Sequence, residues 1–127
     1  MGTLMLTINS RNYGAWSLRG WLLCTFAGID FTVEALQADD PSSRAELLLL
    51  SSSFLVPSLT DGDVHVWDTM AIAEYLHELR PDAGLFPADA AARATCRSIC
   101  GEIHAGFADL RAAMPMNLKA SYDDFKV

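Results

Sequence analysis

The stretch Phe54-Leu55-Val56-Pro57-Ser58-Leu59 is the part of the chain around which the other predicted elements are arranged. Pro57 fixes its own backbone and favours an extended residue before it, so a bend is expected directly ahead of a short strand. Further along, Asp68 and Thr69 stand where a strand gives way to an amphipathic helix, and such a junction can bind an anion. The two segments together predict a site for a small ligand.

The composition indicates a globular protein without a nucleic-acid surface. Of the 127 residues, 51% are hydrophobic and 20% are charged, which predicts one domain, or one domain and a part of another. The formal net charge of -7 argues against nucleic acid as a partner, because such surfaces need clustered Lys and Arg. Neither a signal pattern nor an apolar run of about 18 residues is present, so we expect a cytoplasmic protein that does not contact membranes.

The three cysteines indicate a reducing compartment rather than a disulfide framework. Cys24, Cys96 and Cys100 are an odd number, and each lies inside an apolar helical pattern. Cys96, Cys100 and His104 share one helix face, but three groups on one helix without a second cluster make a poor tetrahedral zinc site. We therefore expect ordinary helix packing there and no metal.

The first half of the chain alternates strands and helices. Residues Thr3–Ile8 predict a buried strand, and the apolar periodicity of Ala15–Ala27 predicts a helix that Gly28 stops. Phe31–Glu34 is typical of a second strand. A short leucine-rich helix is then expected from Ser42 to about Leu50.

The second half begins with a hairpin and continues with helices. The strand that follows Pro57 ends at Asp61-Gly62-Asp63, a strong hairpin signal, and Val64–Trp67 is its partner. An amphipathic helix then follows Asp68 and stops at Pro81. The order β-α-β-α-β-β-α predicts an α/β fold with a mixed four-stranded sheet, parallel at its start and a hairpin at its end.

Beyond this sheet, residues 81–88 are typical of a linker, and residues 89–127 predict one long helix followed by a polar tail. The helix carries an apolar stripe that runs from Ala92 through Cys96, Ile99, Ile103, Phe107 and Leu110 to Met114.

Four segments together resemble the glutathione transferase superfamily, and the resemblance covers residues 3 to about 118. The segments are Val56-Pro57-Ser58-Leu59, the Asp61-Gly62 hairpin, the run Trp67-Asp68-Thr69-Met70-Ala71-Ile72-Ala73-Glu74-Tyr75-Leu76, and Gly84-Leu85-Phe86-Pro87. The resemblance implies a thioredoxin-like, glutathione-binding domain over residues 1–80 and the first helix of an incomplete all-α domain after the linker. The segment from Asn12-Tyr13 to Trp16-Ser17-Leu18-Arg19 is similar to a bacterial branch of the superfamily.

The resemblance assigns a glutathione clamp to the opening stretch. It implies that Pro57 is cis, so that the backbone N–H and C=O of Val56 pair with the cysteinyl part of glutathione like an added strand. Thr69 would hydrogen-bond the γ-glutamyl carboxylate, Asp68 would accept from the γ-glutamyl amine, and Gln37 would reach the glycine end. The alternative for Asp68 and Thr69 is simple helix capping.

The resemblance also implies where catalysis would take place. The nucleophile is the thiol of glutathione, a co-substrate rather than a resident cofactor, and the protein stabilises its thiolate by donating hydrogen bonds. Asn12 occupies the usual catalytic position, and Tyr13, Ser10 or Ser17 are the other candidate donors. Related sequences carry serines directly before the tryptophan, whereas this chain has Gly14-Ala15 there.

Three functions follow as alternatives. The first is conjugation of glutathione to a small electrophile, a detoxification reaction. The second is a glutathione-binding or assembly module without turnover, which Gly14-Ala15 and the absence of the later family helices favour. A dithiol oxidoreductase is disfavoured, because no Cys-x-x-Cys follows the first strand. Since those later helices normally cover the apolar stripe, we expect a homodimer or a higher oligomer.

Overall fold

The computed structural model describes residues 3–9, 14–36, 56–121 and 123, and the helix predicted over Ser42–Leu50 lies outside these ranges. The elements are β1 (Leu4–Ile8), α1 (Ala15–Phe26), β2 (Phe31–Ala35), β3 (Ser58–Asp61), β4 (Val64–Trp67), α3 (Thr69–Leu79), the 3-10 helix η1 (Pro81–Ala83), α4 (Ala90–Ala105) and α5 (Ala108–Ala113).

The four strands form one mixed sheet in the order β2-β1-β3-β4. β1 pairs with β2 in parallel and with β3 antiparallel, and Leu6 stands opposite both Val33 and Leu59. β3 and β4 form the predicted antiparallel hairpin, with Gly62 at a φ of 58° in its turn. This is the predicted mixed sheet, and the thioredoxin-like fold is confirmed.

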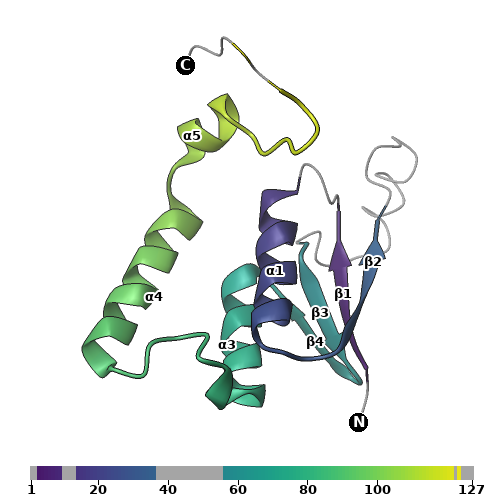
Figure 1. Cartoon of the computed structure of the whole chain (residues 1–127), viewed down its shortest axis with the longest axis vertical. Helices are drawn as coiled ribbons and strands as arrows, with labels where there is room; N and C mark the ends of the chain where they lie inside the picture. Colours follow the sequence, from purple (N-terminus) through teal and green to yellow (C-terminus); the bar gives the residue numbers. More distant parts are fainter. Residues whose placement is uncertain (1–2, 10–13, 37–55, 122, 124–127) are drawn as a thin grey trace.

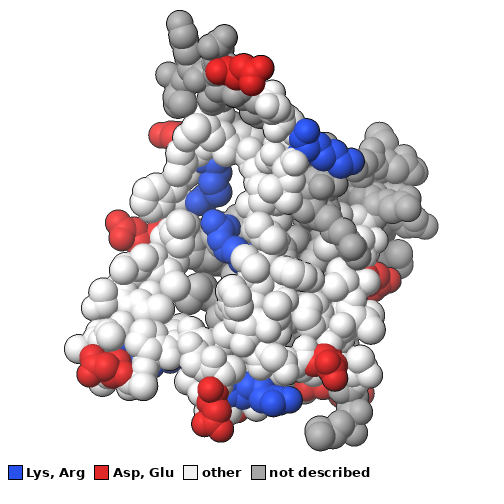
Figure 2. Space-filling model, in the orientation of Figure 1, with Lys and Arg blue, Asp and Glu red and all other residues white. Residues whose placement is uncertain are grey.

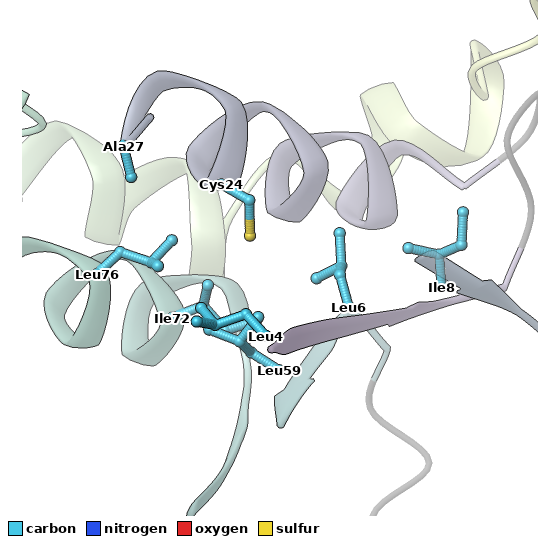
Figure 3. Close-up of a cluster of buried hydrophobic side chains, with 8 residues drawn as sticks. All are labelled: Leu4, Leu6, Ile8, Cys24, Ala27, Leu59, Ile72 and Leu76. Atoms are coloured by element: carbon cyan, nitrogen blue, oxygen red, sulfur yellow. The ribbon is translucent and has the colours of Figure 1, made fainter. Parts of the chain in front are cut away.

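The core lies between this sheet and the helices α1 and α3, which cover one of its faces (Figure 1). Burial alternates along β1, so that Leu4, Leu6 and Ile8 point toward the helices, as period-two geometry requires. Figure 3 shows how side chains from the strands and from both helices meet there. The cluster consists of Leu4, Leu6, Ile8, Cys24, Ala27, Leu59, Ile72 and Leu76.

Cys24 belongs to this core rather than to any reactive site. Its side chain is fully buried, and this burial raises the pKa of the thiol to about 11. A thiol with so high a pKa stays protonated near neutral pH and is a poor nucleophile.

The prediction of one long helix that ends at Met114 was wrong, because the structure contains two helices there. α4 ends at Ala105, where the N–H of Gly106 donates to the carbonyl of Glu102, and Phe107 then adopts the left-handed region at a φ of 61°. A Cβ on Gly106 would lie 2.9 Å from that carbonyl oxygen, so the break uses the glycine. The apolar spacing continues across it, which is why periodicity alone did not reveal it.

Two polar contacts tie α4 to α3, and a hollow remains between α4 and the rest of the domain (Figure 2). The Arg97 guanidinium donates to both carboxylate oxygens of Glu74, at 2.9 and 3.2 Å. Near the other end of α4, His104 Nε2 lies 2.9 Å from Asp68 Oδ1. Over the described residues, no helix combines the length and the apolarity that a membrane crossing requires.

Candidate functional site

The loop that enters β3 is held in place by α1. The Val56–Pro57 peptide bond is cis, as expected, and the Pro57 ring is fully buried. It packs directly on Gly20 inside α1, where a Cβ would approach Pro57 Cβ to 2.7 Å and Cγ to 2.8 Å. Only glycine allows the helix to come this close, so Gly20 fixes the position of the Val56 backbone.

The junction between β4 and α3 has an unusual backbone. Asp68 is the N-cap of α3 at a φ of 80°, a value that non-glycine residues rarely adopt and that recurs at functional sites. Its Oδ2 accepts from the N–H of Ala71 at 3.3 Å. Thr69 is buried at the first position of the helix, where the helix dipole presents positive charge.

A cavity of about 290 Å³ joins these two places. Its size is close to the lower end of small-molecule sites, which span about 300 to 1,000 Å³. Four of the residues predicted to contact glutathione share this cavity, although they come from two separate segments. The lining residues are Trp16, Val56, Pro57, Asp68, Thr69, His104 and Arg111.

Of the four predicted catalytic residues, only Ser17 lies in the described part of the chain. Ser10, Asn12, Tyr13 and Gln37 lie outside the described residues. Ser17 is 2% exposed and does not line the cavity. Its hydroxyl donates to Asn9 Oδ1 at 2.7 Å and accepts from the N–H of Asn9 at 3.2 Å. Ser17 therefore has a structural role, because these hydrogen bonds anchor the start of α1 to the end of β1.

Three residues of the cavity were missed from the sequence. Trp16 was considered only as part of the family resemblance, His104 was considered only as a zinc ligand, and Arg111 was not considered. The rings of His104 and Trp16 form a T-shaped pair, with the ring centroids 5.1 Å apart and the planes at 80°. No sequence motif links these three residues, because α4 and α5 meet the start of α1 only in the folded chain.

A second cavity, of about 270 Å³, lies in the hollow between α1, α3 and α4 (Figure 2). It shares Trp16, Thr69 and His104 with the first, and its other walls are mostly apolar. The remaining lining residues are Arg19, Leu22, Leu23, Phe26, Met70, Ala73, Leu85, Phe86, Cys96, Cys100 and Ile103.

The protein is thus a thioredoxin-like domain that has a cavity between its cis-proline loop and the helix that follows the hairpin. The family model described as glutathione S-transferase, N-terminal domain, matches residues 13–79. The chain therefore belongs to the glutathione S-transferase family.

Solved structures share this fold. A glutathione transferase homolog from Burkholderia GL BGR1, described with bound glutathione, is 24% identical at a TM-score of 0.73, over 88% of this chain and 62% of its own. The glutathione S-transferase unclassified 2 of Bombyx mori is 23% identical at a TM-score of 0.72, over 87% and 52%.

A maleylacetoacetate isomerase from Anaeromyxobacter dehalogenans is 28% identical at a TM-score of 0.60, over 84% of this chain and 45% of its own. The chain thus spans from 45% to 62% of the length of these three structures.

Proposed function

We propose that the chain binds glutathione in the cavity between Val56–Pro57 and Asp68–Thr69. The observation that carries this proposal is that one cavity gathers all four residues, in a chain of the glutathione S-transferase family. The homolog from Burkholderia, which shares the fold, is described with bound glutathione. Val56 lines this cavity and is partly exposed, which supports pairing of its backbone with the cysteinyl residue of the ligand.

The charges around the junction fit the γ-glutamyl end of the ligand. The amides at the start of α3 favour a carboxylate, and Thr69 stands directly beside them. The Asp68 carboxylate already accepts from Ala71 and contacts His104, but its two oxygens offer about four lone-pair sites. We infer that a remaining site accepts from the γ-glutamyl ammonium, and that Gln37 serves the glycine end.

We further propose that the bound thiol is conjugated to a small electrophile. The thiol proton passes to solvent, and the thiolate sulfur forms a bond to an electrophilic carbon. In a substitution, the bond from that carbon to the leaving group breaks and the leaving group departs with the electron pair. In an addition, the carbon–carbon π bond breaks and the neighbouring carbon takes a proton from solvent. Asn12, Tyr13 and Ser10 are the candidates for stabilising the thiolate. Ser17 is the weaker candidate, because its hydroxyl hydrogen already bonds Asn9.

A second function is a glutathione-binding module without turnover. It is favoured by Gly14-Ala15 before Trp16, since neither side chain can donate to a thiolate, and by the buried position of Ser17. Calorimetry with glutathione and a conjugation assay with an aryl halide separate the two functions. Binding with turnover supports the transferase, binding alone supports the module, and no binding at millimolar glutathione contradicts both.

We propose that the chain forms a homodimer or a higher oligomer. The apolar stripe beyond residue 98 remains substantially exposed, and contiguous apolar surface of this kind usually marks an interface. The exposed side chains include Ile99 (58%), Ile103 (42%), Phe107 (50%), Leu110 (49%) and Met114 (43%). Sedimentation at micromolar concentration should show at least a dimer, and a stable monomer would contradict this proposal.

We also propose a cytoplasmic location. Cys24, Cys96 and Cys100 are all free thiols in the structure. Unbridged cysteines suit a compartment that keeps thiols reduced.

A further inference from the structure

Two guanidinium groups from different helices face the same tryptophan ring. Arg19 of α1 places its Cζ 4.0 Å from the centroid of the Trp16 ring, and Arg111 of α5 places its Cζ 5.5 Å from it. Both distances lie within the range of cation–π contact. Figure 2 shows basic side chains in the hollow between α4–α5 and α1.

This cationic pair has no negative partner among the described residues. The ion pairs found there are Arg97–Glu74 and His104–Asp68, and Arg111 donates instead to the carbonyl of Ile103 at 3.1 Å. Arg19 Nη1 is buried and meets no hydrogen-bond acceptor among the same residues. Burial, together with the charge of Arg111, lowers the pKa of Arg19.

Without a bound ligand, this arrangement of two arginines is unfavourable in free energy. A buried donor without an acceptor loses its hydration without replacement, and two like charges repel each other. In a chain with a formal net charge of -7, acidic side chains are abundant, yet none of the described ones forms an ion pair with either arginine, and Asp68, which lines the same cavity as Arg111, contacts His104 instead. An anion between the two guanidinium groups would remove both costs, and the planar donors of arginine suit a carboxylate.

The two cavities indicate where this anion would lie relative to the thiol of the proposed glutathione. Arg111 and Trp16 line the cavity that contains Val56 and Pro57, whereas Arg19 and Trp16 line the apolar cavity between the helices. A ligand held by the arginines can therefore lay an apolar body into the second cavity beside glutathione. The γ-glutamyl carboxylate does not need this pair, since the start of α3 is available to it.

We propose that Arg19 and Arg111 bind the carboxylate of the electrophilic co-substrate, so that the chain selects small electrophiles carrying a carboxylate on an aromatic or other apolar body. This inference rests on the proposed function, because it places the co-substrate next to bound glutathione.

The test compares trans-cinnamate with its neutral analogue cinnamamide by calorimetry, with glutathione titrated separately into the same samples. Cinnamate should bind about tenfold more tightly than cinnamamide, as expected for charge-assisted hydrogen bonds. Arg19→Gln, at a residue that does not line the glutathione cavity, should remove most of this preference and leave cinnamamide and glutathione affinities within about twofold of the unchanged chain. Arg111→Gln should also remove most of the cinnamate preference. Arg80→Gln, at an exposed position after α3, is the matched control and should change none of these affinities.

The possible outcomes separate the two proposals. Equal affinity for cinnamate and cinnamamide overturns the arginine site, and so does a loss of glutathione affinity in Arg19→Gln that matches its loss of cinnamate affinity. Failure of the unchanged chain to bind glutathione overturns the proposed function by itself. If Arg19→Gln fails to fold, Arg19→Lys keeps the charge but not the planar fork, and should retain only part of the cinnamate preference.

Discussion

Gly20→Ala is expected to weaken glutathione binding at least tenfold and to destabilise the fold by about 1–3 kcal/mol, the usual cost of overpacking. The added Cβ would lie 2.7 Å from Pro57 Cβ, closer than real side chains tolerate. The Pro57 ring is rigid and fully buried, so α1 and the Val56 loop must move apart. The higher helix propensity of alanine recovers about 1 kcal/mol at most. Urea unfolding and glutathione calorimetry measure the two effects.

Gly101→Ala is the matched control for this substitution. Gly101 also lies inside a helix, α4, but a Cβ there meets none of the described atoms within 4 Å. Alanine should therefore stabilise this position by about 0.5–1 kcal/mol through helix propensity and leave glutathione affinity unchanged. If Gly20→Ala behaved like Gly101→Ala in both measurements, the close packing of α1 on Pro57 would not position the ligand site.

Asp68→Ala should lower glutathione affinity by about tenfold or more, because it removes a carboxylate proposed to accept from the γ-glutamyl ammonium. It also removes the N-cap of α3 and the contact with His104, so the free energy of unfolding should fall by about 0.5–2 kcal/mol. Asp68→Asn keeps an acceptor and tolerates the positive φ, but lacks the charge. It should therefore recover most of the stability and little of the affinity.

Asp89→Ala supplies the control for capping alone. Asp89 caps α4 through the same kind of hydrogen bond, since its Oδ2 accepts from the N–H of Ala92 at 2.9 Å. Its replacement should cost a similar 0.5–2 kcal/mol or so without changing glutathione affinity. Should Asp68→Ala prove as harmless to affinity as Asp89→Ala, Asp68 would be a helix cap and no more.

The parts of the fold that sequence predicted well have strong local signals. Asp61-Gly62-Asp63 specifies a tight turn, and Pro81 stops the helix that begins after Asp68, so the hairpin and α3 lie where expected. The break between α4 and α5 was missed because Ile103 and Phe107 keep helical spacing across it. Periodicity reports which side chains share a face, and it does not report a change of backbone direction.

The candidate site was only partly predictable for a related reason. Val56 and Thr69 lie in recognisable local motifs, whereas the contact of Gly20 with Pro57 joins residues far apart in the chain. A glycine inside a helical pattern is a hint of close packing, but the partner is not specified. Likewise, nothing local indicates that Arg111 and Arg19 meet on Trp16, because that proximity depends on how α5 follows the break.

The most direct test of the central claim is an amide ¹H–¹⁵N correlation experiment in which glutathione is titrated into the full chain. The proposed site predicts saturable shifts that are largest for the amides of Val56, Thr69 and Met70, with that of Gly101, which lines neither cavity, unchanged. Saturable binding that leaves Val56 and Thr69 unmoved, or no shift at millimolar glutathione, would contradict the claim that this cavity holds the ligand.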